Sequence, residues 1–471
     1  MPEQPRSSLA HRLSLLALAA AGLLTGCASL RSPVTPEPAL TLPAAWSTPT
    51  PGTAQTRAAW WDSFNDPLLG QLVQTALDQG TDVRSALAQV RQARALRAQA
   101  AAALAPSLTL GGVAQASRRD GQASSRSVGV DLDASWEPDL WGANGQALSA
   151  ADADLAAQQA TLASTRTTVA AELVAAYLDL RGAQARSAIA AANLASQEQT
   201  LQLTRWRADA GLVSTLDVDQ AESSAAQTRA QLPALRTAVD QNAHAIAVLT
   251  GAAPGSLLER LSTPAPLPRL AADPALALPA ELLRQRPDIA AAEAALRAAA
   301  ARLDAADAAR LPSLSLGGSL GLNAVTLSGL GAGGAGLATL ASSISLPLPD
   351  GGRLRATVQA QEAVWDQARS RYRATVLAAL QEVEDSLVAV RDQRAQQAEL
   401  ATAVNAAARA ATLAETRYSS GLIDFSTVLS TRRSLLTLQD SAASAATAEQ
   451  QQLLRLLKAL GGGWNPSDMT S

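Results

Sequence analysis

Few side chains in this sequence could perform acid–base, nucleophilic or metal chemistry. Its 471 residues include one cysteine and two histidines, His11 and His244. A zinc site or a histidine-dependent triad needs more of these groups than the chain supplies. Paired acids such as Glu382 and Glu384 lie in stretches that we predict to be helical, where solvated charge is the ordinary explanation. The sequence therefore gives little support to an enzyme, and we expect no catalytic residue, no metal site and no bound cofactor.

The single cysteine, Cys27, stands where a lipid could be attached. Arg6, His11 and Arg12 precede an apolar run from Leu13 to Leu24, and the run ends in Leu24-Thr-Gly-Cys27. The run is too short for a membrane-spanning helix, and this order of charges and apolar residues is typical of a secretory signal. The ending resembles a bacterial lipobox, which predicts cleavage before Cys27 and N-palmitoyl and S-diacylglycerol groups on that residue. The alternative is a signal with A-x-A-type cleavage and an incidental thiol.

The residue after Cys27 indicates a destination, and the charge of the whole chain argues against one class of partner. Ala28 follows Cys27, where an Asp would be the familiar inner-membrane retention signal, so we expect the outer membrane of a bacterium. The net charge is −3 and Lys458 is the only lysine. Because no basic block stands out, nucleic acid is not an expected partner.

The remaining chain is dominated by two very long helical stretches. Between Ala143 and Arg207 there is no proline and only two glycines occur, and small apolar residues recur at three-four spacing. At about 1.5 Å per residue, one continuous helix here would be roughly 100 Å long. It is too polar to lie in lipid, because charges occur along its length: Asp152, Asp154, Arg166, Glu172, Asp179 and Arg181. We therefore expect it to cross an aqueous space, to turn at Gly211 and to return to about Leu249.

The same plan occurs twice in the chain. Gly211 and Gly421 match at an offset of 210 residues, and residues 105–112 match residues 311–318 at an offset of 206. Two constant offsets separated by one small insertion predict a tandem duplication of one unit.

Each unit contains two segments that alternate between apolar and polar residues. In residues 127–136 one set is apolar and the other is small or acidic: Val128, Val130, Leu132, Ala134 and Trp136, against Ser127, Gly129, Asp131, Asp133 and Ser135. Residues 107–117 alternate similarly, although Val113 breaks the pattern, and Leu alternates with Ser and Gly in 313–322. The fourth segment should run from about 338 to 346, after a loop over 323–337. Half-buried strands of a soluble sheet are the common meaning of such a pattern, but the length of about ten residues also suits a tilted strand in a membrane.

Four strands cannot close a membrane barrel, because the smallest single-chain barrels have about eight. An open edge would leave unpaired backbone groups in hydrocarbon. If these strands enter lipid, the chain must form an oligomer.

Four motifs, in this order and spacing, resemble the outer membrane efflux protein family, the TolC-like channels, and within it the lipoprotein branch that serves drug efflux pumps. They are Trp60-Trp to Phe64-x-Asp-Pro67, Trp136-Glu-Pro-Asp-Leu-Trp-Gly142, Arg286-Pro-Asp-Ile289, and the paired turns Arg207 to Gly211 and Arg417-Tyr-Ser-Ser-Gly421. The likeness covers about residues 58–460.

The resemblance implies a mostly α fold with a membrane β part. Three copies would form a homotrimer with a twelve-stranded outer membrane β-barrel, four strands from each chain, continuous with a twelve-helix periplasmic α-barrel. It also implies docking onto a periplasmic adaptor (membrane fusion) protein and an inner membrane transporter of the resistance-nodulation-division type. The expected function is a passive exit duct for drugs and other small molecules. An exit duct of a type I protein secretion system would share these features, whereas a structural envelope-spanning coiled-coil lipoprotein would not explain the strands.

The resemblance also places the turns at Gly211 and Gly421 at the periplasmic mouth, where family members form a gate. Asp217 and Tyr418 match positions used for a polar contact there, so we expect a link between them. The alternative is that Asp217 caps a helix and Tyr418 packs.

Acidic rings are another feature of the mouth that the resemblance implies. Thr427 and Ser430 stand where family aspartates are often found, so the cation preference of the mouth is open. Asp424, Asp209 and Asp219 are the nearest acids that could form a ring instead.

These patterns divide the chain into six parts. They are a lipoprotein signal peptide (1–26), an acylated strap (27–57), a first repeat (58–250) with a β-hairpin at about 106–137 and a helical hairpin at about 142–249, a linker (251–280), a second repeat (281–460) with a β-hairpin at about 312–348 and a helical hairpin at about 352–460, and a tail (461–471).

Overall fold

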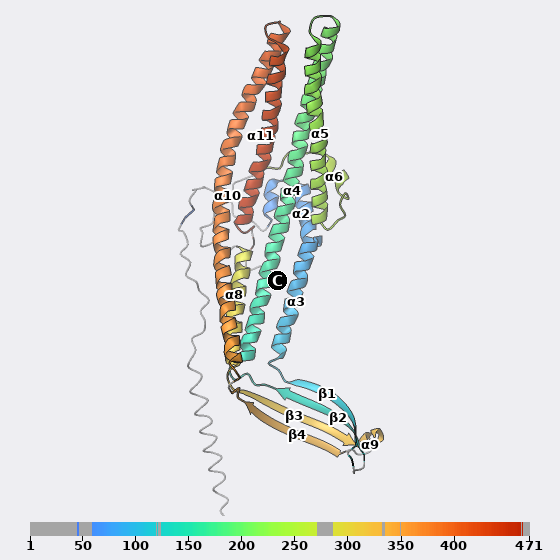
Figure 1. Cartoon of the computed structure of the whole chain (residues 1–471), viewed down its shortest axis with the longest axis vertical. Helices are drawn as coiled ribbons and strands as arrows, with labels where there is room; N and C mark the ends of the chain where they lie inside the picture. Colours follow the sequence, from blue (N-terminus) through green and yellow to red (C-terminus); the bar gives the residue numbers. More distant parts are fainter. Residues whose placement is uncertain are drawn as a thin grey trace, which may run out of the picture.

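A computed structural model shows one elongated chain in which long helices and a small sheet occupy opposite ends (Figure 1). It describes residues 45–46, 59–118, 120, 124–270, 286–331, 335–348, 350–462 and 464. Cys27 and the predicted signal peptide lie outside these residues.

The first repeat begins with short helices whose ends follow from local sequence. The elements are η1 (Trp60–Phe64), α2 (Pro67–Gln79), α3 (Thr81–Ala102), β1 (Ser107–Ser117), β2 (Ser125–Trp136), α4 (Ala143–Asp209) and α5 (Thr215–Leu249). The Asp66 carboxylate accepts hydrogen bonds from the backbone N–H groups of Leu68 and Leu69, and Pro67 takes the first helical position. Gly80 then separates α2 from α3.

The described second repeat has counterparts of α3, β1, β2, α4 and α5, and one further short helix. They are α8 (Pro287–Ala308), β3 (Ser313–Ala324), α9 (Leu327–Gly331), β4 (Ala335–Ser345), α10 (Arg353–Ser419) and α11 (Phe425–Ala459). The predicted loop over 323–337 was therefore partly wrong, because it contains the short helix α9 and the first residues of β4. Its Gly and Ala residues carry no regular periodicity from which a single helical turn could be read.

The two repeats agree closely in length. The helices α3 and α8 have 22 residues each, α4 and α10 have 67 each, and α5 and α11 have 35 each. Their starting residues keep the offsets of 206 before the hairpin and 210 after it. The inserted residues lie between β3 and β4, at the end of the sheet that is furthest from the helices (Figure 1).

The helices form a curved layer rather than a closed bundle. The most extensive helix contacts are those of α4 with α5 and α8, of α10 with α11 and α8, and of α4 with α3 and α11. At the sheet end the order across the layer is α3, α4, α8, α10, and towards the opposite end α5 and α11 take the places of α3 and α8 (Figure 1). A glycine marks one close approach, because a Cβ on Gly182 of α4 would meet the side chain of Thr447 on α11.

The main core lies midway along the layer, where α2 packs against α4. It includes Leu69 and Val73 of α2 and Leu173 and Tyr177 of α4, all fully buried. Between the repeats, α6 (Leu258–Ser262) contributes Leu261 to this core. Among the described residues, no helix has the length and apolarity that crossing a membrane would require.

Candidate functional site: the channel wall and its helical tip

The sheet has one apolar face and one polar face, and neither covers a core. Its strands are antiparallel in the order β1-β2-β3-β4. The register aligns Leu110, Leu132 and Leu320 in one row, and Thr109, Asp133, Ser319 and Thr339 in the neighbouring row. Because side chains alternate across a strand, the two rows lie on opposite faces.

The apolar face is exposed in the single chain. Leu110 is 73% exposed and Leu320 is 61% exposed, and a shallow groove runs between them. A contiguous apolar surface of this kind marks a contact with lipid or with another protein.

The polar face contains the one residue that broke the predicted alternation. Val113 lies on this face opposite Gly129, and a Cβ on Gly129 would stand 3.3 Å from a Val113 methyl group. The valine therefore extends over a position that has no side chain.

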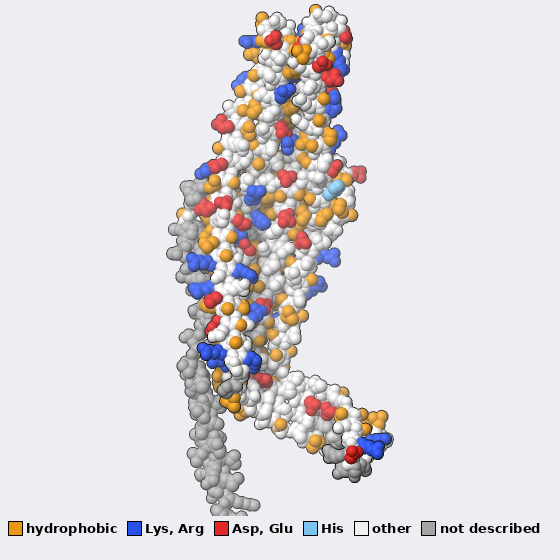
Figure 2. All heavy atoms as spheres, viewed as in Figure 1, with side chains coloured by type: hydrophobic (Ala, Val, Ile, Leu, Met, Phe, Trp, Pro, Cys, Tyr) orange, Lys and Arg blue, Asp and Glu red, His pale blue; other side chains and the backbone are white. Residues whose placement is uncertain are grey.

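Charged side chains are concentrated on the helical part and are sparse on the visible face of the sheet (Figure 2).

At the opposite end, each long hairpin turns through the same helix-ending motif. Gly211 has a φ of 75° and Gly421 a φ of 73°, which favours glycine. The N–H of Leu212 donates to the Arg207 carbonyl at 2.8 Å, and that of Leu422 donates to the Arg417 carbonyl at 2.9 Å. These bonds satisfy the last carbonyls of the first helix and fix the direction of the turn.

The predicted link between Asp217 and Tyr418 is not formed in this structure. The Asp217 carboxylate accepts from the N–H and hydroxyl groups of Ser214, at 3.2 and 3.1 Å, and so completes a capping box at the start of α5. A Ser followed three residues later by an acid is the sequence signal for this arrangement. The local cap competes for the carboxylate, so this prediction was wrong for the conformation seen here.

Tyr418 packs instead of forming a polar contact. The Arg207 guanidinium lies over its ring at 5.3 Å, and the ring of Phe425 is also 5.3 Å away. The Tyr418 hydroxyl is buried and has no hydrogen-bond partner among the described residues. Arg207 thus joins α4 to the second hairpin, which sequence reasoning did not anticipate.

The three acids that could form a ring remain exposed at this tip. Asp209 is the last residue of α4, Asp219 lies on α5, and Asp424 precedes α11 without capping it through its side chain. The single chain does not bring them into contact with one another.

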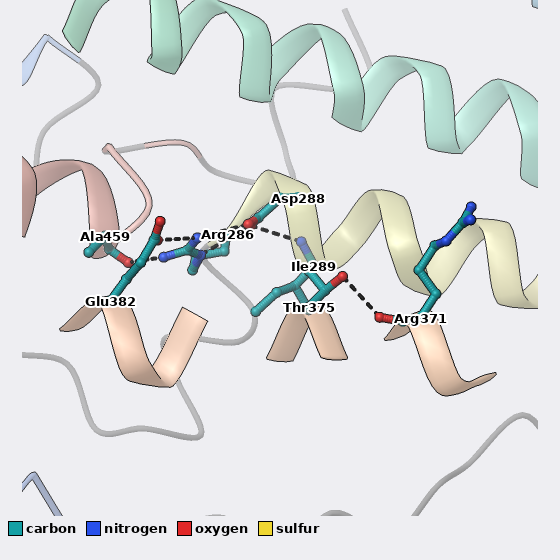
Figure 3. Close-up of polar contacts among 7 residues, drawn as sticks. All are labelled: Arg286, Asp288, Ile289, Arg371, Thr375, Glu382 and Ala459. Atoms are coloured by element: carbon teal, nitrogen blue, oxygen red, sulfur yellow. Dashed lines mark hydrogen bonds and ion pairs between the residues drawn. The ribbon is translucent and has the colours of Figure 1, made fainter. Parts of the chain in front are cut away.

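Arg286 ties the second repeat together where α8 begins (Figure 3). Its guanidinium donates to the Asp288 carboxylate at 2.8 and 3.1 Å, to Glu382 at 2.8 Å and to the Ala459 carbonyl at 2.8 Å. Burial alone would lower the pKa of Arg286, but the hydrogen bonds and charges of Asp288 and Glu382 raise it above the usual value. One side chain therefore joins the start of α8 to α10 and to the end of α11.

In the first repeat, Tyr177 forms a comparable polar cluster. Its hydroxyl donates to the Asp66 carboxylate at 2.7 Å and accepts from the buried Arg181 at 2.8 Å. Arg181 also donates to the Thr263 carbonyl at 2.8 Å. Neither this cluster nor the Arg286 cluster was predicted as a polar network from the sequence. For the first cluster the available signal was Arg181, an arginine among the apolar residues of α4.

The described residues contain no group of three or more His, Cys, Asp or Glu side chains placed to hold a metal ion. The features that the folded chain does present are a sheet with two faces of opposite character, a layer of helices about 100 Å long, and a pair of turns at the far tip.

Comparison with known proteins agrees with this arrangement. The model of the family described as "Outer membrane efflux protein" matches residues 72–252 and 278–462. The pyoverdine export outer membrane protein OpmQ of Pseudomonas putida is 33% identical over 98% of this chain and 100% of that protein. The outer membrane protein OprJ of Pseudomonas aeruginosa is 33% identical over 86% of each chain.

Solved structures show the same fold. The outer-membrane channel OprN superposes with a TM-score of 0.83 and 34% identity, over 93% of this chain and 99% of that one. The open state of the outer membrane channel MtrE of Neisseria gonorrhoeae gives a TM-score of 0.81 and 27% identity, over 93% and 99%. This is the fold of the trimeric α/β-barrel channels. The chain belongs to the outer membrane efflux protein family.

Proposed function

We propose that this protein is the outer membrane channel of a tripartite efflux pump and lets small organic molecules leave the cell passively. The observation that carries this proposal is the sheet, which places leucines on one face and Thr, Ser and Asp on the other. An apolar outer wall suits lipid and a polar inner wall suits water. The long helices below it would extend the water-filled path across the periplasm.

Three copies complete the wall in this proposal. Strands β1 and β4 are the edges of the sheet, so their outer backbone groups lack partners within it. Pairing β4 of one subunit with β1 of the next removes every edge when three subunits close a twelve-stranded ring.

The partners are a periplasmic adaptor protein and an inner membrane transporter of the resistance-nodulation-division type. The paired tips at Gly211 and Gly421 are the surface that would meet them. Leu212 and Leu422, next to these glycines, are 72% and 73% exposed and offer an apolar contact.

Deleting the gene tests the function directly. We expect greater sensitivity to organic solvents, dyes or antibiotics, and unchanged export of secreted proteins. Loss of a secreted protein with unchanged drug sensitivity would instead assign the channel to type I secretion.

The tip acids belong to the same proposal, as a gate that prefers cations. Asp424, Asp209 and Asp219 would face one another around the threefold axis, and neutralising Asp424 (D424N) should reduce the block of single channels by divalent cations. Unchanged block and selectivity in D424N would reject the ring.

The membrane anchor is the last part of the proposal. Acylation of Cys27 would hold the mature N-terminus in the outer membrane. Mass spectrometry of the N-terminal peptide should find diacylglycerol and palmitoyl groups on Cys27, and a Cys27→Ser variant should lack them. An unmodified Cys27 in the mature protein would exclude the anchor.

A further inference from the structure

The four strands of the sheet have a single charged residue on their apolar face. Their sequences contain three charged side chains, Arg126, Asp131 and Asp133, all on β2. The two aspartates lie in polar rows, whereas Arg126 pairs with Ala116 and points to the same side of β2 as Val128. An arginine therefore stands among the side chains that the proposed channel turns toward lipid.

Arg126 lies at one end of this apolar row and Trp136 lies at the other. The two residues are ten positions apart on β2. The residues of the same row between them are all apolar: Val128, Val130, Leu132 and Ala134. At about 3.4 Å per residue and a strand tilt of about 40°, Arg126 and Trp136 are separated by about 26 Å across the membrane. This matches the apolar band of outer membrane barrels, which is about 25 Å tall.

Trp136 marks the boundary on the side of the helices. Its indole N–H donates to the Leu104 carbonyl at 3.1 Å, just beyond the end of α3, and its side chain is 38% exposed. A tryptophan suits a lipid–water boundary, because its ring is apolar and its N–H is polar. The helices extend into the periplasm from this side, so Arg126 lies at the level of the head groups of the outer leaflet.

The sheet carries a net positive charge at this far end. Residues 118–126 contain three arginines and one acid, Asp120, although the net charge of the whole chain is −3. Residues 325–334, between β3 and β4, contain no charged residue. Figure 2 shows basic side chains beside apolar ones at the end of the sheet that is furthest from the helices. The charge at this end therefore comes from the hairpin of β1 and β2.

Arg118 and Arg126 lie close enough to share one ligand. Ser117 of β1 pairs with Ser125 of β2, and their hydroxyl oxygens are 2.7 Å apart. Each arginine directly follows one of these serines. Diagonal neighbours across an antiparallel pair are about 7–8 Å apart, which two arginine side chains can span. Both side chains are exposed, and the described residues form no ion pair with either.

We propose that Arg118 and Arg126 bind a phosphate group of a phosphorylated glycolipid in the outer leaflet of the outer membrane. A guanidinium group donates two parallel hydrogen bonds to phosphate oxygens. The aliphatic stem of Arg126 lies along the apolar row, while its charge reaches the head groups. The inference rests on the orientation proposed above, in which the apolar face meets lipid, and it does not depend on which molecules pass through the channel.

The surroundings of Arg126 favour a lipid over a free anion. Ala116 lies beside Arg126, and Ala114 lies beside Val128, so only small side chains flank the arginine toward β1. The guanidinium is thus open from the apolar side of the sheet. An acyl chain can lie along Val128 and Val130 below it, where a hydrated ion would find no polar partner.

Native mass spectrometry of the purified trimer with added lipid A, a phosphorylated glycolipid, tests the site. We expect Arg118→Gln and Arg126→Gln each to weaken lipid A binding about tenfold, because each removes charge-assisted hydrogen bonds. The matched control is Arg409→Gln, which removes the same charge from an exposed position about 80 Å along α10. This control should bind lipid A as the wild type does.

The chemistry of the added lipid identifies the ligand group. Lipid A from which the phosphates have been removed should bind the wild type weakly, and the arginine substitutions should not change its binding. Arg118→Lys/Arg126→Lys should bind intact lipid A better than Arg118→Gln/Arg126→Gln, because lysine keeps the charge. EDTA should leave binding unchanged, since the guanidinium groups and not a divalent cation on Asp120 supply the positive charge.

Four results would overturn the site. Wild type and Arg118→Gln/Arg126→Gln could bind lipid A equally well, or intact and dephosphorylated lipid A could bind the wild type equally well. Loss of binding in EDTA would show a metal bridge in place of direct contact. Displacement of lipid A by millimolar inorganic phosphate would show a site for a free anion.

Conductance in planar bilayers free of lipid A separates this site from the proposed function. Arg118→Gln/Arg126→Gln should still form channels there, so lipid A binding that is lost while channels persist supports the site. A wild-type protein that binds lipid A through these arginines but forms no channel would reject the proposed function and leave the site standing.

Discussion

Arg286 shows how a single side chain distinguishes the two repeats. The matching position in the first repeat is Gly80, where a Cβ would approach the Leu249 carbonyl to 3.0 Å. Leu249 is the last residue of α5, as Ala459 is the last residue of α11. In the first repeat the backbone at Gly80 lies against the end of α5, whereas in the second repeat the Arg286 guanidinium spans the distance to the end of α11. The same junction is therefore closed by contact in one repeat and by hydrogen bonds in the other.

Removing this guanidinium should weaken the second repeat. Arg286→Ala leaves the Ala459 carbonyl without its donor. Water can replace the guanidinium at Glu382, because that side chain is 56% exposed, so the loss of this ion pair is partly compensated. We expect a loss of about 1–3 kcal/mol in the stability of the folded chain. Arg286→Lys should recover part of it, since lysine carries the charge but cannot form the fork. Thermal unfolding followed by circular dichroism measures the difference, and equal midpoints for wild type and Arg286→Ala would contradict this role.

Tyr177 should make stability fall at high pH. Burial, and next the hydrogen bond to Asp66, raise the pKa of Tyr177 to about 12. An unfolded tyrosine has a pKa of about 10, so the folded chain holds the phenol proton more tightly. The corresponding stability is complete below about pH 10 and is lost as pH rises from about 10 to about 12.

Ultraviolet titration of the phenols tests this assignment. One tyrosine of the wild type should ionise near pH 12, and the Tyr177→Phe variant should lack that step. Tyr177→Phe should also remove the fall in stability between pH 10 and 12. A step near pH 12 that persists in Tyr177→Phe would show that the raised pKa belongs to another tyrosine.

At the residue scale, sequence reasoning located the turns but not the contacts made at them. Gly211 and Gly421 follow from spacing, because a left-handed residue after a long helix is a local requirement. The Asp217 prediction was wrong because a capping partner three residues away outweighs a distant hydroxyl. The contact of Arg207 with Tyr418 joins residues far apart in sequence, and no local pattern encodes it.

At the scale of elements, helix length and position were readable because the two longest helices contain no proline and only two glycines between them. Helix α4 runs from Ala143 to Asp209, within two residues of the predicted bounds. Helix α9 was missed since five residues are too few to show a period. The pairing of β2 with β3 required the fold, because it joins strands of different repeats.

Gly182 tests how closely the long helices approach. Replacing glycine by alanine in an exposed helix normally stabilises it by about 1 kcal/mol. Here the new Cβ would meet Thr447, so we expect Gly182→Ala to destabilise the chain instead. Adding Thr447→Ala should reverse the sign of the effect. If Gly182→Ala alone raised the unfolding temperature, α4 and α11 would be further apart than the structure shows.

The two faces of the sheet can be compared at neighbouring residues of β3. Leu320 belongs to the apolar row and Ser319 to the polar row. An arginine facing lipid near the middle of a membrane costs about 2–4 kcal/mol. We therefore expect Leu320→Arg to reduce the amount of assembled protein in the outer membrane, while Ser319→Arg, which faces water, assembles normally and changes conductance. The reverse result would interchange the two faces.

At the scale of the whole molecule, one chain supplies one third of the wall of the proposed trimeric channel. Alternation in the strands and the polarity of the long helices indicated a water-filled path, and the count of strands required further copies. The order in which the repeats meet could not be predicted from pattern alone, because it depends on which helix faces are left uncovered after folding. The structure supplies those faces, on α3, α5, β1 and β4.

Electrical recording from the purified protein in planar lipid bilayers tests the central claim most directly. A water-filled tube completed by three subunits should give discrete conductance steps from a preparation whose mass in detergent is that of a trimer. Dissociating the trimer before reconstitution should abolish the steps. A monomer that inserts stably into lipid and conducts no ions would contradict the account.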